Sequence, residues 1–154
     1  MDLFPHNREA YDSAVKLFKK ANRVCIIRPT GTGKSVIIAE FVNRNPSKRH
    51  LLLAPGAHIF NEIRKHRRRG EISFSTYIGL KEKDNVFRRN SFDYIYLDEF
   101  LRLGAEVWGN CVDRLLKLNP AAKILGTSAT HIRYLDDSRN MASEIFNDCI
   151  ATQM

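Results

Sequence analysis

The segment PTGTGKS, residues 29–35, combines glycines, a lysine and a serine in a spacing that suits phosphate binding. Gly31 and Gly33 let backbone N–H groups turn toward phosphate oxygens, where a Cβ would obstruct their approach. The Lys34 ammonium is expected to reach the β- and γ-phosphates of ATP, and the Ser35 hydroxyl to bind Mg²⁺. A structural turn that carries the same letters by chance is the alternative interpretation. This phosphate loop predicts an ATP site that includes Pro29, Thr30, Gly31, Thr32, Gly33, Lys34 and Ser35.

An acidic pair, Asp98 and Glu99, follows the apolar stretch YIYL. If this stretch is a strand, the pair lies at its carboxyl end, where ligands of open α/β sheets bind. Asp98 is expected to hold Mg²⁺, directly or through water, and Glu99 to orient and deprotonate an attacking water. A pair that only begins a helix is the alternative, and the phosphate loop argues against it. Lys34, Asp98 and Glu99 are therefore the predicted catalytic residues.

Apolar strands and amphipathic helices alternate along the chain and must position these residues. Strands are predicted at residues 23–28, 50–54, 72–76, 93–98 and 122–130, and helices at 8–21, 34–43, 57–69 and 105–118, with a weaker helical pattern at 136–148. This alternation predicts an α/β fold, with a parallel sheet of about five or more strands and helices on both faces. The stretch ISFSTYIGL alternates as a half-buried strand would, which favours Phe74 and Tyr77 as core residues over base-stacking residues.

Length and composition restrict the class of protein. The chain has 154 residues, of which 44% are hydrophobic and 27% charged, as in one compact soluble domain. No apolar run is long enough for a transmembrane helix, and the first residues lack the pattern of a secretory signal. The cysteines Cys25, Cys111 and Cys149 are widely separated, so we expect small buried side chains, not a zinc site or a disulfide framework. A cytoplasmic protein without a membrane partner is predicted.

Positive charge is concentrated in the first part of the chain. The formal net charge is +8, and residues 1–70 carry 15 lysines and arginines against 5 acidic residues. This asymmetry favours a polyanion partner such as nucleic acid, and a merely solvated basic surface is the alternative. We expect the nucleic acid to be DNA rather than RNA. The densest run, RKHRRR, predicts phosphate contacts, although at helical spacing its side chains would fan around the helix. Its candidate contact residues are Arg64, Lys65, Arg67 and Arg68.

Five segments, taken in chain order, resemble the motifs of a known family. PTGTGKS, LLLAPG, FSTYIGL, LDEF and LGTSAT are similar to motifs I, Ia, a TYxxL-like nucleic-acid element, II and III of superfamily 2 helicases. The chain resembles the first RecA-like, ATP-binding domain of a DEAD/DEAH-box helicase, in particular a bacterial group that shares FPHN, PTGTGKS, LDEF and GTSAT. The resemblance implies the RecA-like P-loop NTPase fold and the use of ATP and Mg²⁺.

The resemblance also implies roles for residues outside the ATP site. Nucleic-acid contacts are implied near Pro55, Gly56 and Thr76. The segment from Ser128 to Thr130 is implied to couple nucleotide state to movement. With the residue that follows, the candidate coupling residues are Ser128, Ala129, Thr130 and His131.

Four positions depart from the general patterns. Arg28 replaces the first glycine of the phosphate-loop pattern, which fits the helicase form of that motif. Asn7 stands where many helicases carry an adenine-reading glutamine, and it is included in the ATP site because it has the same amide. Leu101 replaces a His or Asp that bonds to motif III, and His131 follows Ser-Ala-Thr where proline is usual. One hypothesis is that His131 supplies the polar bond that a leucine at position 101 cannot make, and two independent changes are the alternative.

The function favoured by these patterns is an ATP- and Mg²⁺-binding motor domain of a nucleic-acid helicase or translocase. Residues 1–154 are assigned to one helicase ATP-binding domain, and the family's second RecA-like domain is expected elsewhere, in cis or in trans. An arginine finger contributes roughly 10³–10⁵ in rate, so we expect the chain alone to bind ATP and hydrolyse it slowly. A truncated, non-catalytic nucleic-acid-binding module and a P-loop kinase for a small molecule are the alternatives.

Overall fold

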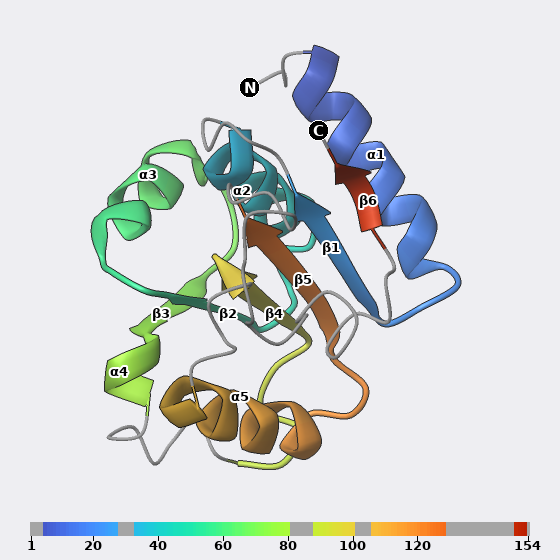
Figure 1. Ribbon diagram of the computed structural model, residues 1–154. Helices are drawn as coiled ribbons and strands as arrows, with labels where there is room; N and C mark the ends of the chain where they lie inside the picture. The colour runs from blue at the N-terminus through green and yellow to red at the C-terminus, as the bar shows by residue number, and fades with distance from the viewer. Residues whose placement is uncertain (1–4, 28–32, 81–87, 101–105, 129–149, 154) are drawn as a thin grey trace.

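A six-stranded parallel sheet forms the centre of the molecule (Figure 1). The computed structural model describes residues 5–27, 33–80, 88–100, 106–128 and 150–153. The strands are β1 (Arg23–Ile27), β2 (His50–Ala54), β3 (Ile72–Thr76), β4 (Tyr94–Asp98), β5 (Lys123–Ser128) and β6 (Ile150–Gln153). Their order across the sheet is β3-β2-β4-β5-β1-β6. The predicted α/β class and parallel sheet are confirmed.

Helices cover both faces of the sheet, as predicted (Figure 1). On one face lie α1 (Pro5–Phe18), α2 (Lys34–Arg44) and α3 (His58–His66), and on the other lie α4 (Tyr77–Leu80) and α5 (Glu106–Leu118). No helix in the described part of the chain is long and apolar enough to cross a membrane.

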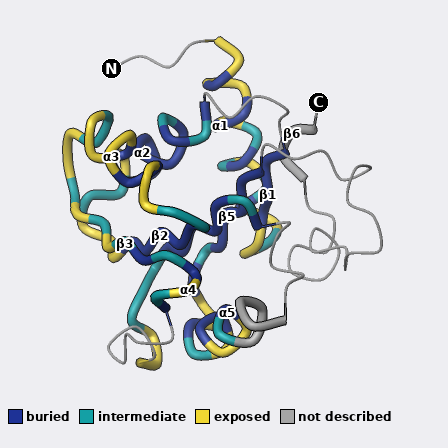
Figure 2. The backbone as a smooth tube through the Cα atoms, turned by 60° about the vertical axis from the view of Figure 1, so that its left-hand side comes forward, coloured by how far each residue is buried: buried dark blue, intermediate teal, exposed yellow. Residues whose placement is uncertain are grey.

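Strands β1, β2, β4 and β5 are buried on both faces over most of their length, because their side chains alternate between two cores. In β2, Leu52 packs in the core beneath α1, α2 and α3, whereas Leu51 and Leu53 pack in the core beneath α4 and α5. In β4, Tyr96 belongs to the first core and Leu97 to the second. In Figure 2 the central strands are mostly buried, and most of the exposed residues lie in the helices and connections.

Several predicted boundaries are wrong, and each has a local cause. The helix predicted at 57–69 ends at His66, because Arg67 adopts an extended backbone (φ −76°, ψ 127°). The strand predicted at 72–76 is confirmed as β3. The half-buried alternation of ISFSTYIGL does not continue as a strand, because the chain turns into α4 after Thr76, whose hydroxyl accepts a hydrogen bond from the Gly79 N–H at 3.0 Å. Tyr77 is nevertheless a core residue, as predicted.

The two ends of the described chain also differ from the sequence prediction. The helix predicted at 8–21 runs from Pro5 to Phe18, and its predicted apolar stripe does face the core. Strand β6 was not predicted, and it pairs in parallel with β1. The helical pattern at 136–148 lies outside the described residues. Cys25 is buried as expected and Cys111 is half-buried, and both are free thiols.

A buried imidazole joins the start of β2 to β4. His50 stacks on Tyr94 and Tyr96, with ring centroids 4.9 and 5.9 Å apart. Its Nε2 lies 2.9 Å from the Asn45 carbonyl oxygen and must donate, because a carbonyl only accepts. Its Nδ1, 2.8 Å from the Tyr96 hydroxyl, therefore accepts from that hydroxyl in the neutral ring. Burial lowers the pKa of His50, although the Asn45 carbonyl and the Asp93 charge act in the opposite direction.

This imidazole should make stability depend on pH. Because the pKa of His50 is lower in the folded protein, the unfolded chain binds the extra proton first, and stability falls as the pH drops below about 6.5. We predict that between pH 8 and pH 5.5 the wild type loses up to about 1 kcal/mol more free energy of unfolding than His50→Gln, which cannot titrate. Urea unfolding at both pH values measures the difference, and parallel pH dependences would contradict the prediction.

Candidate nucleotide-binding site

The strand order brings the phosphate loop and the acidic pair to one edge of the sheet. Strand β5 lies between β1 and β4, with Ile27 opposite Ser128 and Asp98 opposite Thr127. All three strands are parallel, so their carboxyl ends point to the same edge. The first residue of α2, Lys34, follows β1 at that edge, and Asp98 ends β4 there. The end of β5, which carries Ser128, is thus the element between the two halves of the site.

The Lys34 ammonium lies between the two carboxylates of the acidic pair. Its Nζ is 3.0 Å from Asp98 Oδ1 and 3.2 Å from Glu99 Oε1. Asp98 is only 1% exposed and also accepts a hydrogen bond from the Thr127 hydroxyl at 3.0 Å. The three residues predicted to be catalytic are therefore brought together, although 65 positions separate Lys34 from Glu99.

Burial and charge act against each other in this cluster. Burial alone would lower the pKa of Lys34, but the charges of Asp98 and Glu99 outweigh it and raise that pKa. Burial also raises the pKa of Asp98, and the Lys34 ammonium and the Thr127 hydroxyl offset part of this rise. A buried carboxylate needs such partners to remain charged. Two carboxylates and one ammonium leave one negative charge, which favours a further cation at this edge.

The backbone around the acidic pair is held in an unusual conformation. Glu99 has a positive φ of 53°, which is uncommon for a residue other than glycine, asparagine or aspartate. Such a conformation costs about 1–3 kcal/mol and persists only where the surroundings impose it. One restraint is visible, since the buried Tyr77 hydroxyl donates a hydrogen bond to the Asp98 carbonyl oxygen at 2.7 Å. Tyr77 begins α4, so this bond ties the end of β3 to the acidic pair.

Asn7 packs against the last glycine of the phosphate loop. Gly33 is the N-cap of α2, and no side chain among the described residues caps it by a hydrogen bond. A Cβ at Gly33 would overlap the Asn7 side chain, reaching 2.9 Å from Cγ and closer still to Oδ1. Asn7 is itself only 3% exposed. The structure thus places Asn7 beside the predicted ATP site, and a Cβ at position 33 would force the Asn7 side chain to shift.

The side chains at this edge suit Mg²⁺ and a nucleotide. Mg²⁺ usually takes one or two carboxylates and completes its shell with phosphate oxygens and water. Asp98 and the buried Ser35 hydroxyl are oxygen donors of this kind. The described residues hold no cluster of three or more His, Cys, Asp or Glu side chains. The donor set therefore fits a metal that arrives with a phosphate ligand.

The residues predicted to contact nucleic acid lie in two separate places. Pro55 and Gly56 follow β2, and Thr76 ends the neighbouring β3 in register with Ala54, so these three are close. Arg64 lies elsewhere, on α3, with its guanidinium 4.7 Å from the Phe74 ring centroid. Lys65 is exposed on the same helix.

The sequence predicted that the side chains of the basic run fan around a helix, but residues 67–69 lie beyond the end of α3. The Arg67 guanidinium donates a hydrogen bond to the Gly70 carbonyl oxygen. The backbone N–H groups of Arg68 and Arg69 both donate to Asn43 Oδ1, at 2.6 and 3.0 Å. The chain leaves the helix after His66 and docks on α2 instead.

Some predicted residues lie outside the described part of the chain, and two hydrogen bonds were not predicted. The undescribed residues are Arg28, Pro29, Thr30, Gly31, Thr32, Leu101, Ala129, Thr130 and His131. The hydrogen bonds of Tyr77 and Thr127 to Asp98 did not emerge from the sequence. Thr127 directly precedes the Ser-Ala-Thr segment. This position was the only feature of the sequence that could have indicated a contact with the acidic pair.

Comparisons with known proteins agree with this arrangement. The family model for the type III restriction enzyme, res subunit, matches residues 1–69. Among curated proteins, none matches the chain. Two solved structures of the large terminase ATPase domain from Thermus phage P74-26, one of them a mutant, are similar, with 14% and 15% identity and a TM-score of 0.51. Each match covers 75% of this chain, which spans 63% of the length of the terminase domain.

These likenesses show the fold and the general kind of domain. The terminase similarity, at low identity, shows that the chain has the fold of a P-loop ATPase domain. The restriction-subunit match covers the segment from α1 to the end of α3, including the phosphate loop. Together they support a nucleotide-binding P-loop domain of helicase-like type.

The contact between Asn7 and Gly33 should be measurable as an energetic coupling. Gly33→Ala places a methyl group against Asn7 and should destabilise the protein by about 1–3 kcal/mol, as overpacking of a buried contact does. We predict that Asn7→Ala relieves this strain, so the double variant is more stable than the sum of the single changes implies by about 1 kcal/mol. Chemical unfolding of the four proteins gives the coupling, and additive effects would show that the two residues are not in contact.

Proposed function

We propose that this chain is the ATP- and Mg²⁺-binding motor domain of a DEAD/DEAH-box-like helicase or translocase. The observation that carries the proposal is the meeting of Lys34 with Asp98 and Glu99 at the carboxyl edge of the sheet. Burying these charges costs desolvation energy that an apolar core would avoid. Clusters of this kind are typical of functional sites.

In this proposal each residue has a distinct task. Lys34 moves from the carboxylates to the β- and γ-phosphates of ATP when the nucleotide enters. Ser35 and Asp98 would hold Mg²⁺, which would supply positive charge to the phosphate oxygens. Glu99, released from Lys34, orients the attacking water and accepts its proton.

The remaining hydrogen bonds support coupling between the nucleotide and a second ligand. The Tyr77 hydroxyl bonds to the Asp98 carbonyl, and Tyr77 directly follows Thr76, a candidate nucleic-acid contact. Thr127 bonds to Asp98 and directly precedes Ser128. Hence the elements similar to motif III and to the nucleic-acid element both touch the acidic pair. The DEAD/DEAH assignment itself rests on the order of the five segments along the chain.

Loss of the Lys34 ammonium should abolish ATP binding. We predict that Lys34→Ala weakens ATP·Mg²⁺ binding by at least about 100-fold, because a charge-assisted bond to two phosphates is removed and two carboxylates are left to repel them. Isothermal titration measures the affinity. The matched control is Lys20→Ala, which removes an exposed ammonium just beyond α1 and should bind ATP as the wild type does. Equal ATP affinity of Lys34→Ala and the wild type would refute the proposed site.

Substitution of Glu99 should lower ATP turnover without changing ATP affinity. Glu99→Gln keeps the shape of the side chain but removes the proposed base, so ATP affinity should stay within about threefold of the wild type. Turnover should fall by about 10²–10⁴-fold, the usual contribution of a general base. Phosphate release measured with saturating ATP, alone and with added duplex DNA, tests this. Unchanged turnover in Glu99→Gln would remove Glu99 from the proposed role.

A further inference from the structure

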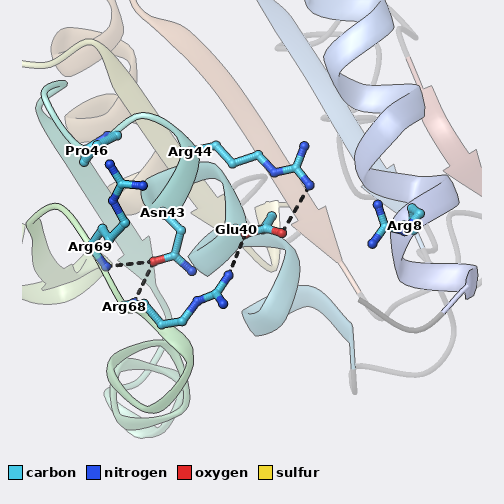
Figure 3. Close-up of a pocket in the computed structure, with 7 residues that line it drawn as sticks. All are labelled: Arg8, Glu40, Asn43, Arg44, Pro46, Arg68 and Arg69. Carbon is cyan, nitrogen blue, oxygen red and sulfur yellow. Dashed lines mark hydrogen bonds and ion pairs between the residues drawn. The ribbon is translucent and has the colours of Figure 1, made fainter. Parts of the chain in front are cut away.

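A basic cavity lies beside α2. The cavity has a volume of about 490 Å³. Figure 3 shows the side chains that line it. Four arginines line it together with one carboxylate and one amide, and we refer to it as the arginine pocket. Its polar lining residues are Arg8 from α1, Glu40, Asn43 and Arg44 from α2, and Arg68 and Arg69 from the segment between α3 and β3.

The side-chain amide of Asn43 fixes one wall of the arginine pocket. Asn43 is 7% exposed, and its Oδ1 accepts the backbone N–H groups of Arg68 and Arg69. Its Nδ2 donates to the His66 carbonyl oxygen at 3.2 Å. A single buried amide therefore holds the turn that follows α3 against α2. The backbone that carries two of the four arginines is thereby held in place.

The carboxylate of Glu40 orients two of the guanidinium groups. Glu40 is 5% exposed, and its two oxygens lie 3.5 Å from Arg44 Nη2 and 3.7 Å from Arg68 Nη2. The two arginines approach it from different sides (Figure 3). The Arg44 guanidinium also lies over the Tyr11 ring, 4.9 Å from its centroid. Glu40 thus organises the arginines but neutralises only one of their charges.

The arginine pocket keeps an excess of positive charge. Four guanidinium groups and one carboxylate line it, which leaves a net charge of about +3. Within the described residues, no ion pair or side-chain hydrogen bond is found for Arg8 or for the Arg69 guanidinium. Guanidinium groups present planar pairs of N–H donors that match two oxygens of a phosphate. The chemistry of the pocket therefore suits an anionic group with paired oxygens, such as a phosphate.

Most of the arginine pocket lies away from the ATP site, and Arg8, the neighbour of Asn7 on α1, is the exception. Pro46, which also lines the cavity, precedes β2, and the arginines at 68–69 precede β3. These segments lie toward the amino-terminal edge of the parallel sheet. The phosphate loop and the acidic pair follow β1 and β4 at the opposite edge, and Pro55, Gly56 and Thr76 also follow strands there.

From this geometry we infer that the arginine pocket binds the phosphodiester backbone of a nucleic acid. The inference rests on the proposed function in that a motor domain of helicase-like type engages nucleic acid, and it adds a contact surface at the other edge of the sheet. Arginine contacts to phosphates give affinity without sequence preference. A protein partner would need an apolar anchor. The one large hydrophobic side chain exposed among the described residues is Ile78, on α4 across the sheet.

The test compares two pairs of neutralising substitutions. Arg8→Gln with Arg69→Gln removes two pocket charges while leaving Glu40 and Asn43 with their partners. Lys19→Gln with Lys20→Gln removes the same net charge from exposed positions just beyond α1. A labelled 20-base-pair DNA duplex is titrated by fluorescence anisotropy between 50 and 200 mM salt, with ATP binding and thermal unfolding of each protein as controls.

We expect the pocket variant to bind the duplex at least about tenfold more weakly in 50 mM salt, with a salt slope smaller by about 2, since each phosphate that is no longer neutralised reduces that slope by about 0.9. The lysine variant should stay within about twofold of the wild type. ATP binding and unfolding temperature should be unchanged in both variants. Such unchanged ATP binding keeps this test independent of the proposed ATP site.

Three results would overturn the inference. Equal losses of affinity in the two variants would mean that net charge alone attracts the duplex. Absence of duplex binding by a wild type that still binds ATP would remove nucleic acid as the ligand while leaving the ATP site intact. Binding of polyglutamate as strongly as the duplex, with the same sensitivity to Arg8 and Arg69, would identify an acidic protein as the partner.

Discussion

The ion-pair cluster of Lys34, Asp98 and Glu99 is the interaction on which the organisation of the molecule depends. Asp98 lies inside the protein at the end of a central strand, where an unpaired carboxylate would be strongly disfavoured. Its partner comes from the start of α2, after a different strand, and a third strand lies between them. The cluster therefore requires the observed strand order. It also leaves one negative charge, which a metal bound to a nucleotide can satisfy.

The interactions around this cluster connect it to the remaining elements at the same edge. Tyr77 ties the end of β3 to the Asp98 backbone, and Thr127 ties the end of β5 to the Asp98 carboxylate. Asn7 brings α1 against Gly33 at the start of α2. The ends of β3 and β5 and helix α1 are therefore in contact with residues of the proposed nucleotide site. The opposite edge carries the arginine pocket, whose charges are organised by Glu40 and Asn43 from the same helix α2. Helix α2 carries residues of both sites.

The sequence predicted those features that depend on local pattern. The strands that carry the phosphate loop and the acidic pair are continuous apolar runs, so their place and type were evident, and two glycines with Lys34 identified the loop. Features that depend on distant partners were not predictable. The turn after His66 exists because Asn43, 25 residues from Arg68, accepts its backbone N–H. Strand β6 is short and forms only by pairing with β1. The hydrogen bond from Tyr77 to Asp98 depends on the turn into α4. That turn was not predicted, because the sequence of this segment alternates like a strand.

The most direct test of the central claim is a crystal structure of this chain with Mg²⁺ and a non-hydrolysable ATP analogue. We predict that the Lys34 ammonium leaves Asp98 and Glu99 for the β- and γ-phosphates, and that Ser35 and Asp98 contribute oxygen ligands to Mg²⁺. Glu99 should then face the γ-phosphate through a water molecule. A structure with the analogue bound elsewhere, and with Lys34 still paired to both carboxylates, would contradict the account.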